Sequence, residues 1–448
     1  MTHAINQNPL FYQTSADLPL VNRAEGIYIW DESGKQYIDG CSGAVVCNIG
    51  HNDKTVLTAI NDQARSSFFT YRTQFNNRPA FELAQNLVKH SAAHLNRVFY
   101  VSGGSEAVES AIKLCRSYYI SKGESSRYLF ISRSPSYHGS TLGALSLTSY
   151  APLEIPYRPL FKSWPKIPAP YCYRCKYQMT YPSCGLACAH ALEQVIEEQG
   201  PENVAAFVTE PIGGASSGAL VPPEDYFAVI RNICDRYGVM LIFDEVMTGF
   251  GRTGRLFAYE HWNVSVDIVA LSKGMASGYY PLGAIMTRED IVQNVLSSGG
   301  FPHGHTYAGN PMACAVGVAV LKRIIEDRLS ENAKVMGDRL MRGLARLAEK
   351  YPIIGQVRGK GLLTALEFVQ DRESKRPFPT KLQVNNLITA NAFDNGLIIY
   401  PRRPINGLSG DHVLIAPPLI IKANEVDEML QRLDAALAET TADLQKAS

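Results

Sequence analysis

Three groups of residues with distinctive chemistry each follow a short apolar segment of the chain. They are Gly104-Ser105, Asp244 and Lys273, which come after the segments RVFYVSG, VMLIF and DIVALS. Short apolar segments of this kind are typical of buried parallel strands. Ligands of such sheets bind beyond the carboxyl ends of the strands. We therefore expect the three groups to lie together at one edge of a sheet.

Each group has a possible chemical role and an ordinary structural alternative. Gly104 and Ser105 open an expected helix, whose free backbone amides can bind a phosphate, although a Gly-Gly-Ser sequence is more often only a turn. Asp244 is costly to bury without a cationic partner, so it could pair with a cationic group of a ligand. An acid that caps a helix is the structural alternative. Lys273 lies among small residues, where burial favours the neutral amine that Schiff-base chemistry needs. A lysine that extends to the surface is the alternative.

Taken together, the three groups are those that pyridoxal 5′-phosphate (PLP) requires. This cofactor needs a phosphate site, an acid beside its protonated pyridine nitrogen, and a lysine that holds it as a Schiff base. The combination predicts a PLP-dependent enzyme with Lys273 and Asp244 as its catalytic residues.

The bulk composition restricts the class of protein. The 448 residues carry a net charge of +1 at pH 7, which argues against nucleic-acid binding, and no apolar run approaches the ~18 residues of a membrane span. The first residues, MTHAINQNPLFYQTSADLPL, contain neither the basic segment nor the long apolar segment of a secretory signal, so we do not expect export. Most of the nine cysteines are scattered singly, so we expect a reduced, cytoplasmic location.

The middle of the chain predicts an α/β fold. Helices and short apolar strands alternate there, which is typical of a mostly parallel sheet covered by helices. We assign residues 61–327 to a large cofactor-binding domain of this kind.

The two ends of the chain predict a smaller α+β domain. After Asp327 come a long charged helix, the strands of VRGKGLLTALEFV, a second helix from Lys381, further strands and a final helix. The hairpin GIYIWDESGKQYIDG is expected to pack against them. The smaller domain is therefore discontinuous, with residues 1–60 as its N-terminal part and residues 328–448 as its C-terminal part.

The sequence resembles the class III (omega-type) aminotransferases, which are PLP-dependent enzymes of fold type I. The resemblance covers nearly the whole chain and follows the family's order of motifs. Its central motifs are IFDEVMTGFGRTG, which contains Asp244, and LSKGMASGYYPLGA, which contains Lys273. The others are GIYIWDESGKQYIDGCSGAVVCNIGH, SGGSEAVESAIKL, SYHGSTLGAL, TEP, HTYAGNPMACA, VRGKGLL and APPLII.

The resemblance implies how the chain holds PLP. Lys273 forms the Schiff base and later moves the proton between the substrate carbon and the cofactor, while Asp244 pairs with the pyridinium nitrogen. Gly104 and Ser105 hold the phosphate.

It also implies the surroundings of the cofactor ring. Tyr137 stacks on one face of the ring, and Val246 packs against the other. Glu210 either pairs with an arginine of the substrate pocket or braces the surroundings of the cofactor. Thr306 reaches the phosphate of a neighbouring subunit, so the active protein is a homodimer or a tetramer.

A transaminase must also bind the carboxylate of a 2-oxo acid such as pyruvate or 2-oxoglutarate. A bidentate arginine is well matched to a carboxylate, and the family carries it on the loop before the PP strand. The candidates are Arg402 and Arg403, of which we choose Arg403. Residues 42–46 and 67–71 are expected to line the side of the pocket that accepts the amino donor.

Two other kinds of function stay open. A racemase, epimerase, aminomutase or decarboxylase of the same fold would use the same lysine and return the proton to a different atom. A regulator that binds PLP without catalysis is the second alternative, although the intact Lys273 and Asp244 argue against it.

Four of the cysteines are not scattered. Cys172, Cys175, Cys184 and Cys188 form CxxC followed by CxxxC, a spacing that can bind zinc. Reduced thiols in an insertion loop are the alternative. No histidine or carboxylate accompanies the four at a useful spacing, so we predict no catalytic metal.

Overall fold

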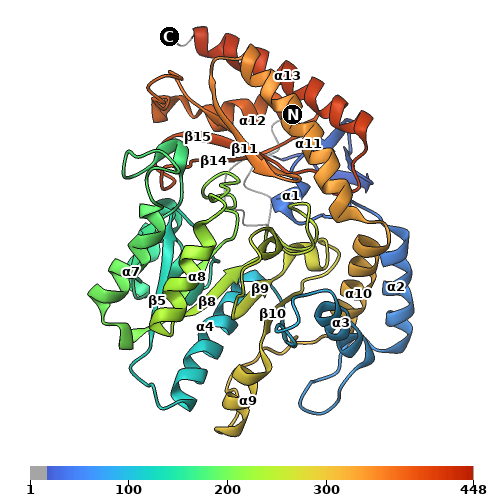
Figure 1. The fold of residues 1–448 in the computed structure, drawn as a ribbon. Coiled ribbons are helices and arrows are strands. Elements are labelled where there is room, and N and C mark those ends of the chain that lie inside the picture. The colour runs from blue at the N-terminus through green and yellow to red at the C-terminus, as the bar shows by residue number, and fades with distance from the viewer. Residues whose placement is uncertain (1–17, 447–448) are drawn as a thin grey trace.

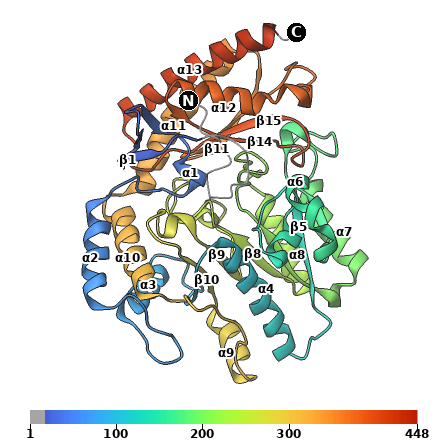
Figure 2. The same ribbon diagram turned by 180° about the vertical axis from the view of Figure 1, so that it is seen from behind.

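The structure is a computed structural model that describes residues 18–446. Most of the stretch on which the expected absence of a secretory signal rests lies outside these residues. The chain forms one body around a seven-stranded sheet and a second body of two smaller sheets and long helices (Figure 1; Figure 2). Among the described residues, no helix is both long enough and apolar enough to cross a membrane.

The seven-stranded sheet is parallel except for one strand. β10 runs antiparallel to its neighbours β4 and β9, and all other neighbours in the sheet are parallel. In sheet order the strands are β4 (Arg97–Val101), β10 (Gly283–Thr287), β9 (Ile268–Leu271), β8 (Met240–Asp244), β7 (Val204–Thr209), β5 (Leu129–Ser134) and β6 (Lys166–Pro168).

Helices cover both faces of this sheet. Ile242 of β8 packs in a cluster with residues of α4 (Gly104–Ser121). Phe243, the next residue, packs in another cluster with residues of α8 (Tyr226–Tyr237). Successive side chains of a strand point to opposite faces, so the two helices lie on opposite sides of the sheet. Apolar strands of this kind need such a double cover.

The second sheet joins the two ends of the chain. β13 (Leu397–Ile398) pairs in parallel with β3 (Gln36–Asp39), so a strand of the C-terminal part extends the N-terminal hairpin. The hairpin itself consists of β2 (Tyr28–Asp31) and β3, with β1 (Val21–Glu25) at the edge of the sheet.

The third sheet is antiparallel and belongs to the C-terminal part of the chain. Its order is β11 (Ile354–Lys360), β12 (Leu363–Phe368), β15 (Asp411–Ile415) and β14 (Tyr400–Arg402). It is accompanied by α11 (Leu329–Lys350), α12 (Val384–Asp394) and α13 (Ala423–Lys446). These sheets and the covered parallel sheet confirm the predicted fold class. The domain limits 1–60, 61–327 and 328–448 stay a prediction.

One helix begins later than the sequence predicts. The helix expected from Lys381 begins at Val384, because a 3-10 turn over Thr380–Leu382 ends at Gln383, whose φ of 44° is left-handed. The remaining α-helices are α1 (Ser42–Val45), α2 (Lys54–Ser66), α3 (Arg78–Lys89), α5 (Leu142–Leu147), α6 (Ala151–Glu154), α7 (Ala187–Gln199), α9 (Glu289–Ser297) and α10 (Pro311–Glu326).

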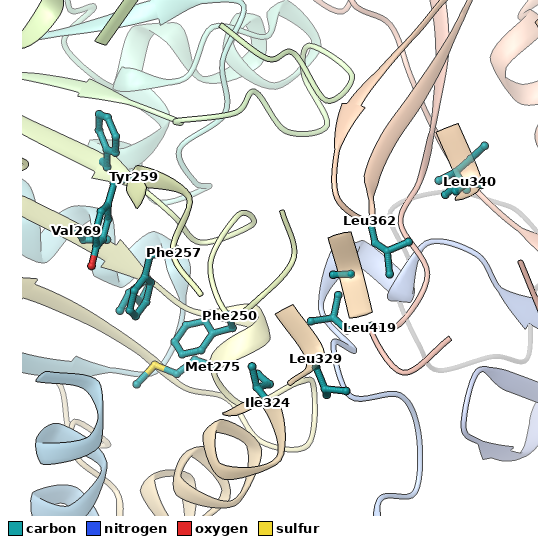
Figure 3. Packing of buried hydrophobic residues seen from close by; sticks show 14 of the residues in the cluster. Phe250, Phe257, Tyr259, Val269, Met275, Ile324, Leu329, Leu340, Leu362 and Leu419 are labelled. Carbon is teal, nitrogen blue, oxygen red and sulfur yellow. The ribbon is translucent and has the colours of Figure 1, made fainter. Parts of the chain in front are cut away.

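A continuous hydrophobic core connects the two bodies. One cluster contains Phe250 and Val269 of the large sheet region together with Leu329 and Leu362 of the C-terminal part (Figure 3). Met275 belongs to the same cluster and is fully buried. Because Met275 lies two residues after the expected Schiff-base lysine, the core anchors the turn that carries this lysine.

Candidate active site

Neighbouring strands of the large sheet deliver three of the predicted residues to one edge. Glu210 directly follows β7, Asp244 ends β8, and Lys273 lies two residues after β9. β7, β8 and β9 are adjacent and parallel, with Asp244 opposite Ala270. The carboxyl ends of parallel strands meet at the same edge, so the three side chains lie close together.

One cavity at this edge brings together most of the predicted site. Seven predicted residues line it: Gly104, Ser105, Tyr137, Glu210, Asp244, Val246 and Lys273. The other residues in its walls are His138, Gly139, Ile212, Ala215, Met247 and Thr248. One cavity therefore contains the expected phosphate site, the acid and the lysine, although Gly104 and Lys273 are 169 positions apart in the sequence.

Lys273 has an unusual backbone and a weakened proton affinity. Its φ of 46° lies in the left-handed region, which is costly for a residue with a Cβ. Its carbonyl accepts hydrogen bonds from the N–H groups of Ala276 (3.2 Å) and Ser277 (2.9 Å). Burial lowers the pKa of Lys273 from 10.5 to about 8, although Asp244 and Glu210 act in the opposite direction. At pH 7 roughly one such amine in ten is neutral, compared with roughly one in three thousand at the ordinary pKa.

Asp244 is buried and held at both carboxylate oxygens. Oδ1 accepts a hydrogen bond from the N–H of Val246 (3.1 Å), and Oδ2 lies 2.9 Å from Nδ1 of His138. The His138 side chain is fully buried, and its Nε2 has no hydrogen-bond partner among the described residues. Sequence reasoning missed His138. Its place directly after Tyr137 in SYHG is the signal that could have identified it.

Glu210 braces the wall that carries Tyr137. Its Oε1 accepts a hydrogen bond from the N–H of Gly214 (2.8 Å), and its Oε2 accepts one from the N–H of Tyr137 (3.3 Å). The backbone carbonyl of Glu210 accepts a hydrogen bond from the buried guanidinium of Arg133. Burial raises the pKa of Glu210. Of the two roles considered for this residue, these contacts favour bracing.

The N-terminus of α4 supplies free amides at a position where only glycine fits. The first amides of a helix have no intrahelical partner and bind anions readily. Gly104 is the first residue of α4, and Ser105 follows it with a hydroxyl that accepts a hydrogen bond from the N–H of Ser140 (3.0 Å). A Cβ on Gly104 would lie 2.8 Å from Cγ1 of Val246, too close for any real side chain. The close approach of α4 to Val246 therefore depends on Gly104.

Two of the predicted residues do not line the cavity. Thr306 is exposed, on the connection between α9 and α10. The guanidinium of Arg403 donates a hydrogen bond to the carbonyl of Thr380 (3.2 Å). Residues 42–46 and 67–71 also contribute nothing to the cavity walls of the single chain.

Arg402 lies in a different environment from Arg403. Its guanidinium carbon is 4.5 Å from the centroid of the Tyr400 ring. Its positive charge is also among the causes that lower the pKa of Lys273. Of the two arginines considered from the sequence, Arg402 is therefore the one shown to act electrostatically on the cavity.

PLP fits this cavity on the evidence of its own side chains and backbone. Lys273 offers an amine of lowered pKa, Asp244 offers a buried carboxylate, and α4 offers unpaired amides. The buried His138 ring lies beside the Asp244 carboxylate, and its Nε2 has no hydrogen-bond partner among the described residues. The fold and the cavity together define a PLP-dependent enzyme of fold type I.

Comparison with known sequences identifies the family. The family model for class III aminotransferases matches residues 12–437. The chain is 38% identical over 436 residues to an uncharacterized aminotransferase of Bacillus subtilis (strain 168), covering 97% of this chain and 98% of that protein. It is 34% identical over 425 residues to the putrescine–pyruvate aminotransferase of Pseudomonas aeruginosa, covering 94% of this chain and 91% of that protein.

Comparison with solved structures agrees. An (S)-enantioselective omega-transaminase from Thermomicrobium roseum matches with a TM-score of 0.91 and 36% identity, over 97% of this chain and 96% of that chain. A second match is an amine transaminase from an uncultivated Pseudomonas species, which was solved with PLP bound. Its TM-score is 0.90 and its identity 34%, over 97% of this chain and 98% of that chain. The chain belongs to the class III aminotransferases. It is an enzyme that uses PLP to transfer amino groups between amines and 2-oxo acids, which confirms the function and cofactor predicted from the sequence.

We expect Gly104→Ala to weaken PLP binding by about 5- to 150-fold, because the added Cβ would force Val246 or α4 to move at a cost of about 1–3 kcal/mol. The dissociation constant of PLP, measured by titrating the apoenzyme, tests this. Gly103→Ala is the matched control, since a Cβ there would meet no atom within 4 Å and its backbone is extended. Wild-type affinity in both variants would contradict the assignment of Gly104.

Proposed function

We propose that this enzyme transfers the amino group of a primary amine or an omega-amino acid to a 2-oxo acid such as pyruvate or 2-oxoglutarate. The observation that carries the proposal is the convergence of Lys273, Asp244 and the N-terminus of α4 on one cavity. A relative named for putrescine and pyruvate, 34% identical, supports a donor with a terminal amine.

We assign the proton transfer to Lys273. PLP, when bound, supplies the electron sink for the negative charge that forms on the substrate carbon. The amine of Lys273 would take the proton from that carbon and give it back, since a pKa of about 8 keeps both protonation states of the amine accessible near neutral pH. Asp244 would pair with the protonated ring nitrogen of bound PLP, and His138, whose Nδ1 lies 2.9 Å from Oδ2 of Asp244, keeps the carboxylate oriented.

We assign the remaining residues of the cavity to cofactor binding. Gly104 and Ser105 hold the phosphate through the amides of α4 and the serine hydroxyl. Tyr137 and Val246 both line the cavity and would contact opposite faces of the bound ring, which would add stacking and burial to the binding energy. Glu210 holds the backbone of Tyr137 in place through the 3.3 Å hydrogen bond to its N–H.

We propose that Arg402 binds the carboxylate of the 2-oxo acid. Its guanidinium donates hydrogen bonds to the hydroxyl of Tyr400 (2.5 Å) and the carbonyl of Pro401 (3.1 Å). Both partners are neutral, and a carboxylate can replace them as a stronger, bidentate acceptor. Arg403, chosen from the sequence, is the second candidate.

We propose that the enzyme is a homodimer in which Thr306 completes the phosphate site of the partner subunit. Thr306 is exposed and lies outside the cavity of its own chain. The adjacent Tyr307 is 63% exposed, and its ring centroid lies 6.0 Å from that of Phe69, which is 46% exposed. Phe68 is also exposed, and its carbonyl accepts a hydrogen bond from the Asn310 side chain (3.1 Å). Exposed aromatic patches of this kind mark protein interfaces.

We also propose a cytoplasmic location. All nine cysteines lie within the described residues and are free. Free thiols in this number are typical of a reducing compartment.

Lys273→Ala is expected to abolish transamination and the visible absorbance that an imine between the lysine and PLP produces. In wild-type holoenzyme, an amine donor mixed without any 2-oxo acid should yield one carbonyl product per chain and leave the cofactor in its amino form. A racemase or decarboxylase would give no such product. Persistence of the visible band in Lys273→Ala would show that another residue carries the cofactor.

Arg402→Ala is expected to raise the KM for the 2-oxo acid by about 10- to 100-fold, because a charge-assisted pair contributes about 1.5–3 kcal/mol. The KM for a donor without a carboxylate should change little. Arg403→Ala is the matched control and should leave both constants near wild type. A reversed result, with Arg403→Ala as the damaging change, would assign the carboxylate to Arg403.

Thr306→Asp is expected to weaken PLP binding by about tenfold or more, because the carboxylate would repel the phosphate. Co-expressing this variant with Lys273→Ala tests the partner assignment. A mixed dimer then contains one complete site, with Lys273 from one chain and Thr306 from the other, and it should recover wild-type PLP affinity in that site. If Thr306 acted within its own chain, mixing would recover nothing. Light scattering on the wild type should give twice the mass of one chain.

A further inference from the structure

A loop with four cysteines lies outside the cofactor cavity. Cys172, Cys175 and Cys184 lie between β6 and α7, Cys188 is the second residue of α7, and none of the four lines the cavity around Lys273. Two residues separate the cysteines of the first pair, and three residues separate those of the second pair. Both spacings occur in known zinc-binding loops. The reaction proposed above uses none of them.

The fold gathers these four side chains around one small cavity. All four line a single cavity with a volume of about 20 Å³. A space of this size holds about one water molecule, or one metal ion. The other walls include Tyr171, Tyr177 and Leu186. Cys172 is exposed and the other three cysteines are half-buried, so an ion in solution can reach the sulfur atoms.

The thiols are close enough to influence one another electrostatically. Burial raises the pKa of Cys188 to about 11, and the charges of Cys172, Cys184 and Cys175 add to the effect. Burial and the charges of Cys175 and Cys184 likewise raise the pKa of Cys172. These contacts show that the four thiols are neighbours, and a divalent cation bound among them would favour the thiolate form of each one.

The sulfur atoms are near one another but not yet in ligand positions. Among the described residues, no three of these sulfurs lie within 4.8 Å of one another. The group that does meet this distance, Asp39, Cys47 and His51, already has a direct hydrogen bond of 2.9 Å between His51 and Asp39. That bond accounts for the second group without a metal.

We propose that Cys172, Cys175, Cys184 and Cys188 bind one structural zinc ion as a tetrathiolate. Zinc binding breaks four S–H bonds, releases four protons and forms four Zn–S bonds, without any oxidation. Four protein ligands fill the tetrahedral site and leave no open position for a substrate, so the ion is structural. Lys176, which lines the same cavity, contributes a positive charge beside the doubly negative zinc–thiolate group.

The zinc site would stabilise a loop that contacts the C-terminal part of the chain. Tyr171, directly before Cys172, donates a hydrogen bond to Glu367, and Arg174 donates one to the same carboxylate (2.5 Å). Glu367 also pairs with Arg358 (2.5 Å), whose Nε donates to the carbonyl of Gly218 (2.5 Å). The loop is therefore linked by direct contacts to the segment that supplies Ala215 to the cofactor cavity. Losing the ion should lower the thermal stability of the protein.

Metal analysis of the purified holoenzyme tests the proposal. We expect about one zinc ion per chain after dialysis against a weak chelator, with four sulfur neighbours at about 2.3 Å in zinc X-ray absorption. Holoenzyme that carries PLP but no zinc, even after Zn²⁺ is supplied during expression, would overturn the proposal. Nitrogen or oxygen neighbours in the absorption spectrum would overturn it as well, since they would place the ion elsewhere.

Cysteine variants locate the ion. Cys172→Ser combined with Cys184→Ser should lose the zinc and lower the Tm. Cys115→Ala and Cys314→Ala are the matched controls, since they remove buried thiols far from this loop in the sequence and should keep the zinc. Full zinc content in the double variant would overturn the proposal. If the double variant does not fold, the wild-type metal content and absorption spectrum still decide.

Discussion

Charge burial at the carboxyl edge of the large sheet is the constraint on which the active site depends. Lys273, Asp244 and Glu210 end three neighbouring strands, and each would be costly to bury alone. Burial favours the neutral amine, whereas the two carboxylates favour the charged one. The balance leaves the pKa of Lys273 at about 8. A lysine in this state is partly neutral at physiological pH and can still carry a proton, and both properties are needed for its two tasks.

Backbone geometry determines the shape of the cavity around these charges. Gly104 lets α4 approach Val246 more closely than any residue with a Cβ would allow. Lys273 accepts a left-handed φ, and the buried Met275 ties the following turn to the core. Such strain is stable only where the surrounding packing imposes it. The core that joins the two bodies of the molecule thereby contributes to the position of the reactive amine.

The C-terminal part of the chain supports one wall of the cavity and carries the proposed carboxylate-binding arginine. β14 carries Arg402, and β11 and β12 carry the Arg358–Glu367 pair. Arg358 holds the carbonyls of Ser217 and Gly218, and His412 of β15 lies 2.9 Å from the carbonyl of Ala215. The wall formed by Ala215 thus rests on the C-terminal part of the chain.

Much of the active site could be predicted before the structure because strand ends are encoded locally. A short apolar segment followed by Asp244 or Lys273 indicates a buried parallel strand and a polar residue at its end, and parallel strands place such ends at one edge. The order of the motifs then identified the family. His138 could not be assigned in this way, because its importance lies in a contact with Asp244 across 106 positions of the sequence.

The sequence by itself determined the fold class, the cofactor and the residues that follow each strand, because these depend on hydrophobic pattern and on residue type at fixed positions. Only the tertiary structure decided which residues meet. It placed Arg402 and Arg403 in different surroundings although they are neighbours in the chain, and it gathered four cysteines of one loop around a single cavity. It also lowered the pKa of Lys273, since burial exists only once the chain is folded. The lysine is encoded in the sequence, and its reactivity comes from the surroundings that folding creates.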